Sequence, residues 1–72
     1  MARGRLELDA VFDALQALPE ADRAALLMHV QDGLSYAAIA STLGLSIAAV
    51  KVRVHRARVK LRAMVSRAED ER

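Results

Sequence analysis

The sequence predicts an all-α fold, a small domain of four helices in which the last two form a helix-turn-helix. Apolar residues recur at helical spacing along the chain, and no strand pattern interrupts them. Pro19, Gly33 and Gly44 separate the successive segments. The chain has 72 residues and no cysteine, so we expect one domain that is stabilised by helix packing alone.

The first predicted helix covers residues 7–17, where Leu8, Val11 and Leu15 recur at helical spacing with Phe12 beside them. The short basic segment before this helix carries no apolar pattern, and neither does the acidic segment at the C-terminal end of the chain. The expected organisation is therefore a flexible leader at 1–6, the domain at 7–66 and a frayed tail at 67–72.

The second predicted helix runs from about Pro19 to Gln31, and Gly33 is expected to adopt a left-handed conformation after it. This helix has more apolar surface than one core contact needs. Leu26, Leu27 and Val30 form one face; the other face holds Ala21, Ala24, Ala25 and Met28. Either the first helix covers that second face, or a partner protein docks on it.

Ser35 is expected to cap a short third helix that ends near Leu43, and Gly44 permits the positive φ of a tight turn. Ser46 caps the fourth helix in the same way. Placing the following residues 100° apart divides that helix into two faces. The inward face holds Ile47, Val50, Val54, Ala57, Leu61 and Val65. The outward face holds Ala48, Val52, His55, Arg56 and Val59, flanked by Lys51 and Ala49.

The charge is distributed unevenly along the chain. Residues 1–35 hold three basic and six acidic residues, a net −3, whereas residues 36–72 hold eight and three, a net +5. Seven basic residues and no acidic one lie between Lys51 and Arg67. A basic helix can be merely a solvated face, but behind a tight glycine turn it favours binding to nucleic acid.

On a helix that enters the major groove, Val52 is placed to touch a thymine methyl group and Arg56 to reach a guanine edge or a phosphate. Ala48 and Ala49 are small enough to let the backbone approach DNA closely. The helix N-terminus and the Ser46 hydroxyl suit a phosphate. His55 is either a DNA contact or simply exposed.

The sequence contains no acid–base pair, nucleophile constellation or glycine-rich phosphate loop, so it does not predict an enzyme. No cofactor, metal site or small-molecule substrate is expected. No apolar run reaches the ~18 residues of a membrane span and no signal peptide is evident, so a cytoplasmic location is expected.

The ordered motifs of the chain resemble one family over roughly residues 8–65. They are Leu18-Pro19-Glu20, Arg23, Leu26-Leu27, Gly33-Leu34-Ser35-Tyr36, Ile39-Ala40, Leu43-Gly44-Leu45-Ser46, Val50-Lys51, Arg53, His55-Arg56-Ala57-Arg58 and Leu61-Arg62. This combination is similar to region 4 of bacterial extracytoplasmic-function (ECF) sigma factors.

The resemblance implies that the domain recognises the −35 element of double-stranded promoter DNA and docks on the flap of the RNA polymerase β subunit. It also implies control by an anti-sigma factor. Lys51, Val52, His55 and Arg56 would then lie at the DNA, and Arg53 in intramolecular or backbone contacts. The residues expected to face a protein partner are Val11, Leu15, Ala24 and Met28.

The chain departs from the family at three places. Ala37 and Ala38 replace acidic residues, Ala48 and Ala49 replace a small-plus-Thr pair, and Val52 replaces a frequent Ser or Thr. These changes remove hydrogen-bonding groups, so base recognition is expected to be weak or differently specified. Region 2, which opens promoter DNA, does not form part of this sequence.

Two other functions are compatible with the pattern. The first is a sigma-like protein-interaction module, bound by an anti-sigma factor, in which DNA binding is weak or lost. The second is the effector domain of a LuxR-type response regulator, which shares the Leu43-Gly44-Leu45-Ser46 and Val50-Lys51 motifs. The run from His55 to Arg62 fits the sigma pattern better.

Overall fold

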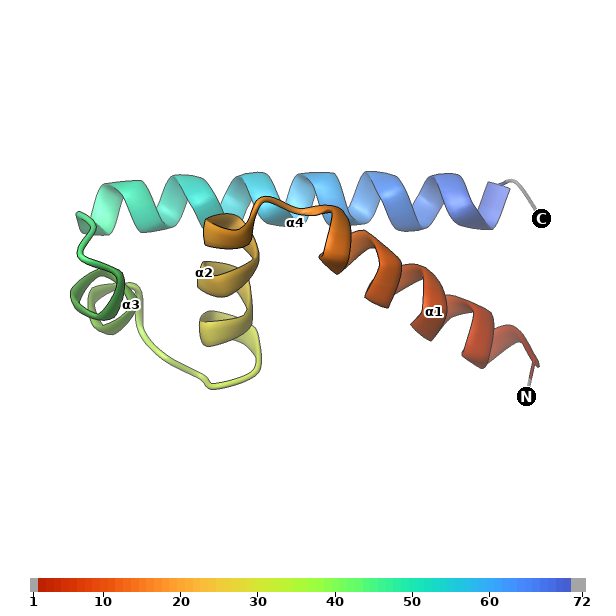
Figure 1. The fold of residues 1–72 in the computed structure, drawn as a ribbon, viewed down its shortest axis with the longest axis horizontal. Coiled ribbons are helices and arrows are strands. Elements are labelled where there is room, and N and C mark those ends of the chain that lie inside the picture. The colour runs from red at the N-terminus through yellow and green to blue at the C-terminus, as the bar shows by residue number, and fades with distance from the viewer. Residues whose placement is uncertain (1, 71–72) are drawn as a thin grey trace.

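The computed structural model describes the backbone of residues 2–70 and the side chains of residues 8–67 and 70. These residues form four helices and no strand, which confirms the predicted fold class (Figure 1). The helices are α1 (Ala2–Ala17), α2 (Glu20–Val30), α3 (Tyr36–Leu43) and α4 (Ile47–Asp70). α1 begins before the expected residue 7 and α4 continues past 66; the parts of the predicted leader and tail at Met1, Glu71 and Arg72 lie outside the described residues.

α4 is the common support of the other three helices, each of which packs against it (Figure 1). It has 24 residues and is therefore about 36 Å long. Val50, Val54 and Ala57 are almost fully buried along one side of it, together with Ile39 of α3. These small side chains allow the shorter helices to approach α4 closely.

The first helix does not cover the second face of α2, the one with Ala21, Ala24, Ala25 and Met28, so that prediction is wrong. α1 diverges from α2 and packs along α4 instead (Figure 1). The physical reason is that the apolar stripe of α4 continues past Ala57 to Leu61 and Met64, which extend the core toward α1. On α2, Ala25 is buried and Met28 packs against the core, while Ala21 is exposed.

The inward prediction for α4 is correct for Val50, Val54 and Ala57, and Leu61 and Val65 are half-buried. It is wrong for Ile47, whose side chain is 48 % exposed. Ile47 is the first residue of α4 and lies one turn before Val50, beyond the edge of the core.

Local hydrogen bonds fix both the start of α3 and the turn between α3 and α4. The Ser35 hydroxyl oxygen accepts a hydrogen bond from the Ala38 N–H (3.1 Å), which confirms the predicted cap of α3. Gly44 has φ +69°, and the Leu45 N–H donates to the Ala40 carbonyl (2.9 Å), as in a Schellman motif. The chain bends by 103° between α3 and α4, within the range of a helix-turn-helix. In the described part of the chain, no single helix is long and apolar enough to cross a membrane.

Because Ile39 is fully buried, we expect Ile39→Val to lower the free energy of unfolding by about 0.5–1.5 kcal/mol through the loss of one methylene group. Urea unfolding followed by circular dichroism measures this change. Val30→Ala, at a side chain that is 62 % exposed, is the control and should change stability by less than about 0.5 kcal/mol. Equal losses in both variants would contradict a core centred on α3 and α4.

Candidate nucleic-acid interface

The outward side of α4 presents the residues that the sequence assigned to it. Val52 and Val59 are 56 % and 51 % exposed, although valine is usually buried. The exposed residues of this side, here called the outward face, are Ala48, Lys51, Val52, His55, Arg56 and Val59. A continuous helix therefore offers apolar and basic side chains together on a surface that no other part of the described chain covers.

The N-terminus of α4 provides donors beside this face. The Ser46 hydroxyl oxygen accepts a hydrogen bond from the Ala49 N–H (3.0 Å), which confirms the predicted cap and leaves the hydroxyl proton available to donate. The first turn of α4 contains no acidic residue. Ala48 is exposed and Ala49 is half-buried, so small side chains surround the amide groups. The positive end of the helix dipole thus faces a position that suits an anion.

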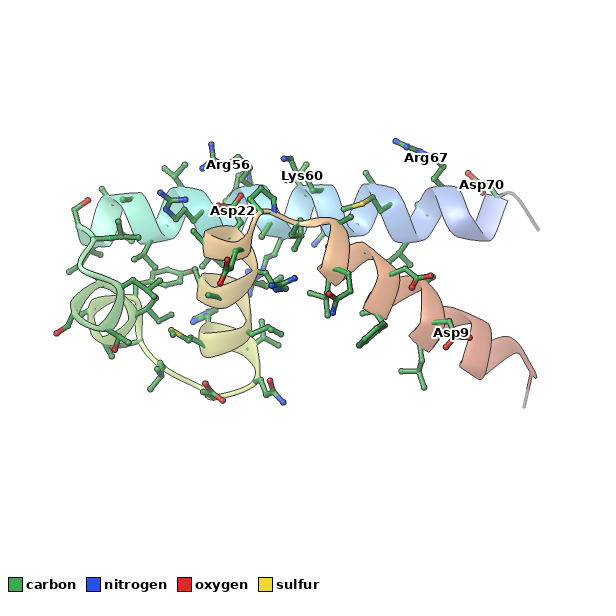
Figure 2. All side chains as sticks on the ribbon, viewed as in Figure 1. Asp9, Asp22, Arg56, Lys60, Arg67 and Asp70 are labelled. Atoms are coloured by element: carbon green, nitrogen blue, oxygen red, sulfur yellow. The ribbon has the colours of Figure 1, made fainter. Side chains whose placement is uncertain are left out.

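Basic residues border the outward face on both sides. Arg56, Lys60 and Arg67 recur along one edge of α4 (Figure 2). Lys51, Arg58 and Arg62 follow the other edge by helical spacing and are also exposed. A polyanion that lies along α4 can therefore be contacted from both edges.

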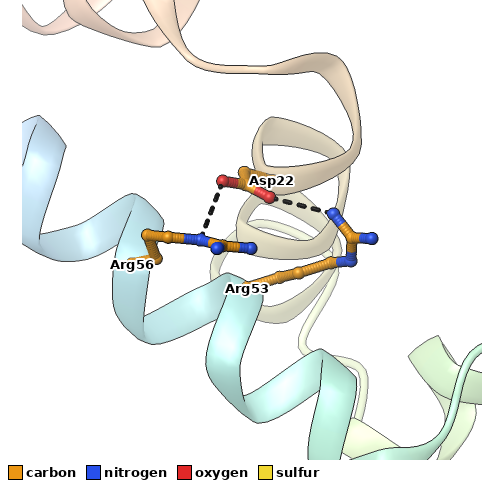
Figure 3. A network of polar contacts seen from close by, with 3 residues as sticks. All are labelled: Asp22, Arg53 and Arg56. Carbon is orange, nitrogen blue, oxygen red and sulfur yellow. Dashed lines mark hydrogen bonds and ion pairs between the residues drawn. The ribbon is translucent and has the colours of Figure 1, made fainter.

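Asp22 joins α2 to α4 beneath one of these edges (Figure 3). Its carboxylate is 3 % exposed; Oδ1 accepts a hydrogen bond from Arg53 Nη1 (3.2 Å), and Oδ2 lies 3.5 Å from Arg56 Nε. Arg53 thus makes an intramolecular contact, whereas Arg56 combines exposure with an internal partner.

Asp22 is not among the site residues predicted from the sequence. A signal was nevertheless present, because Asp22, Ala25, Leu26 and His29 recur at the i, i+3, i+4, i+7 spacing of one helix face. A carboxylate on a buried face needs a cationic partner, and α4 is the part of the sequence that carries one.

A second surface is an apolar groove of about 580 Å³ between α1, α2 and the second half of α4. The lining residues, here called the groove, are Val11, Leu15, Leu26, Leu27, Val30, Arg58, Leu61, Arg62, Val65 and Ser66. The structure therefore brings Val11 and Leu15 together, but Ala24 and Met28 do not line the groove. Leu8 and Phe12 of α1 are 71 % and 61 % exposed, so α1 presents further apolar surface.

The histidines do not form part of a metal site in the described residues. His29 Nδ1 lies 3.0 Å from the Leu34 carbonyl oxygen, and its ring centroid is 4.6 Å from that of Tyr36. His55 is exposed among basic residues. Among the described residues no group of three His, Asp or Glu side chains is placed to hold a metal ion.

The fold and the outward face define a helix-turn-helix domain of the DNA-binding class. A family model described as sigma-70, region 4, matches residues 8–61. The chain is also 40 % identical over 58 residues to the ECF RNA polymerase sigma factor SigE of Mycolicibacterium smegmatis, a match that covers 81 % of this chain and 23 % of that protein. The chain therefore belongs to the sigma-70 region 4 family, of the kind found in ECF sigma factors. This assignment favours the sigma interpretation over the LuxR-type one, and the family is one of DNA-binding transcription domains rather than enzymes.

Because the Ser46 hydroxyl satisfies an N–H group at the start of α4, Ser46→Ala is expected to lower the free energy of unfolding by about 1 kcal/mol. Thermal or urea unfolding measures the loss. Ser66→Ala, an exposed position inside α4, should leave stability unchanged or raise it slightly, since alanine is the better helix former. A Ser46→Ala variant as stable as Ser66→Ala would show that the cap contributes nothing.

Proposed function

We propose that this domain binds the −35 element of double-stranded promoter DNA through the outward face of α4. The observation that carries the proposal is the combination, on one helix, of an exposed face, a capped N-terminus and two basic edges without an acidic residue between Lys51 and Arg67. The chain spans about a quarter of the length of the sigma factor it matches. Transcription initiation as a whole then requires the other regions of such a protein, and it takes place in the cytoplasm.

In the proposed complex, α4 lies in the major groove with its N-terminal turns against the bases. The amide groups of the first turn and the Ser46 hydroxyl bind a backbone phosphate, which fixes the register of the helix. Lys51 and His55 contact the backbone or base edges, and Arg56 contacts a guanine edge. These contacts are supported by the exposure of the four side chains involved, Ser46, Lys51, His55 and Arg56.

The alanines in the first turn of α4 give this interface an apolar character. Ala48 and Ala49 let the helix approach the bases, and Val52, which is 56 % exposed, is placed for a thymine methyl group. Specificity then depends on one apolar contact and one arginine rather than on several hydroxyl groups.

We also propose that the groove binds a helix of a protein partner, either the flap of the RNA polymerase β subunit or an anti-sigma factor. The support is the apolar lining between α1, α2 and α4, together with exposed Leu8 and Phe12 at its approach. Val11 and Leu15 are the residues of the predicted partner surface that lie there. Arg58 and Arg62 line its α4 side and suit an acidic partner segment.

A second candidate function is a protein-interaction module in which the outward face itself binds a partner. The observation that favours it is Val59, which is 51 % exposed, lies two turns beyond Val52 and shares with it a shallow hollow on α4. A partner that covers both valines would exclude DNA from the same face.

Arg56→Ala is expected to weaken binding to a duplex selected from a randomised library by about 1–3 kcal/mol, because a guanine contact is lost. Fluorescence anisotropy over a salt series, with a scrambled duplex beside the selected one, measures the change. The wild-type affinity should fall steeply with salt: the logarithm of the association constant should decrease linearly with the logarithm of the salt concentration, with a slope of about −0.9 for each neutralised phosphate.

The matched control is Arg67→Ala, which removes the same charge eleven residues further along α4, about 16 Å away. It should weaken binding to both duplexes equally and only slightly. If Arg56→Ala also weakens both equally, Arg56 is not a base contact. If no duplex is selected at all, the protein-interaction module is the better explanation.

Val30→Asp, a substitution in the groove at an exposed side chain, is expected to weaken binding to an isolated β-flap fragment at least about tenfold, since the complex would bury a carboxylate in place of an apolar contact. Isothermal titration calorimetry measures the affinity. Val59→Asp on the outward face is the counterpart: it should retain flap binding and lose DNA binding. The reverse pattern, with Val59→Asp losing the flap, would place the protein partner on the outward face.

A further inference from the structure

Asp22 contacts Arg56 at Nε, so the two terminal nitrogens of Arg56 remain available for another partner. The Arg56 Nε lies 3.5 Å from Asp22 Oδ2, while Oδ1 is occupied by Arg53 Nη1 at 3.2 Å (Figure 3). An arginine has five N–H donors, four of which are on the two terminal nitrogens. This contact through Nε is an ion pair without a hydrogen bond, and it restricts the direction of the guanidinium group without using its terminal nitrogens on Asp22.

The two arginines that share this carboxylate differ in exposure. The side chain of Arg53 is 31 % exposed and that of Arg56 is 51 % exposed. Arg53 makes the hydrogen bond and neutralises a carboxylate that is 3 % exposed, which a folded protein would otherwise not tolerate there. Arg56 adds a weaker contact and remains accessible from the outward face.

We propose that Asp22 is a positioning residue that sets the base specificity of this domain through Arg56. The inference rests on the proposed DNA-binding function. A free arginine on a helix surface has many rotamers and pairs with the nearest phosphate. One whose Nε pairs with a carboxylate has fewer accessible rotamers and keeps its terminal nitrogens directed away from that carboxylate, which favours bidentate contact with guanine. The negative charge of Asp22 also reduces the attraction of this edge for phosphate.

Asp22→Asn tests the proposal, because asparagine has the same shape and retains an acceptor for Arg53 but loses the charge. We expect the ratio of affinities for the selected and scrambled duplexes to fall about tenfold, within the range of one bidentate arginine contact. Binding to the scrambled duplex should stay the same or become tighter, since a negative charge near the DNA is lost. A purely structural role would instead weaken binding to both duplexes together.

Glu20→Gln is the matched control, since it makes the same charge change at an exposed residue in the same turn of α2. It should leave the affinity ratio unchanged. In the Arg56→Ala background, Asp22→Asn should have no further effect on the ratio, which a double-mutant cycle measures. In the free protein, the ¹⁵N resonance of Arg56 Nε should shift in Asp22→Asn and not in Glu20→Gln.

Circular dichroism establishes whether Asp22→Asn is folded. If Asp22→Asn is unfolded, Arg56→Lys replaces it as the test. Lysine keeps the charge, but its single nitrogen cannot pair with Asp22 and also make a bidentate contact with guanine. The ratio of affinities for the selected and scrambled duplexes should therefore fall, while the affinity for the scrambled duplex stays unchanged. An unchanged ratio in the folded variant, or an equal fall in the Arg56→Ala background, overturns the proposal. If the wild type prefers no duplex, the proposed function fails and the inference fails with it; a wild-type preference that survives in Asp22→Asn overturns the inference alone.

Discussion

The buried side of α4 is the contact on which the rest of the structure depends. α1, α2 and α3 all pack against this one helix, α1 diverges from α2, and the core cluster of the described residues lies along α4. Val50, Val54 and Ala57 are buried on that side while Val52 and Val59 are exposed on the other. Because both faces belong to the same rigid helix, the packing that stabilises the domain also fixes the direction of the surface that is proposed to meet DNA.

The two surfaces of the domain lie on different sides of α4 and share α2. Asp22 of α2 faces the edge of α4 that carries Arg53 and Arg56, whereas Leu27 and Val30 face the groove beside Arg58 and Arg62. A protein helix in the groove would therefore leave the Arg56 edge uncovered. A partner in the groove would occupy Arg58 and Arg62, so DNA bound at the same time would keep the Arg56 edge and the N-terminal turns of α4. A partner large enough to reach across Arg62 to Val59 would compete with DNA.

The features predicted correctly from the sequence, such as caps, the turn and helix faces, depend on neighbouring residues. The features that were missed depend on contacts between residues far apart in the chain. The caps at Ser35 and Ser46 and the positive φ of Gly44 follow from short-range hydrogen bonding and sterics, so their prediction was correct. The outward face of α4 followed from helical periodicity. The course of α1 depended on how far the apolar stripe of α4 extends, which local patterns do not give. The spacing of α2 indicates that Asp22 lies on a buried face, but its individual partners are 31 and 34 residues away and could not be obtained from local patterns. Ile47 shows the same limit, since periodicity gives the direction of a side chain but not where the core ends.

Under the proposed function, the apolar residues in the first turns of α4 affect how the domain can distinguish one base sequence from another. Lysines and arginines along the edges of α4 attract any DNA, because phosphate contacts carry no sequence information. With alanine at 48 and 49 and valine at 52, hydroxyl groups do not contribute donors or acceptors at these positions. In the proposed complex, polar specificity then favours a side chain whose direction is restricted, since a mobile cation prefers the phosphates. Arg56 is the outward-face residue that pairs with a buried carboxylate, so under our proposal Asp22 connects the packing of α2 to the selectivity of α4.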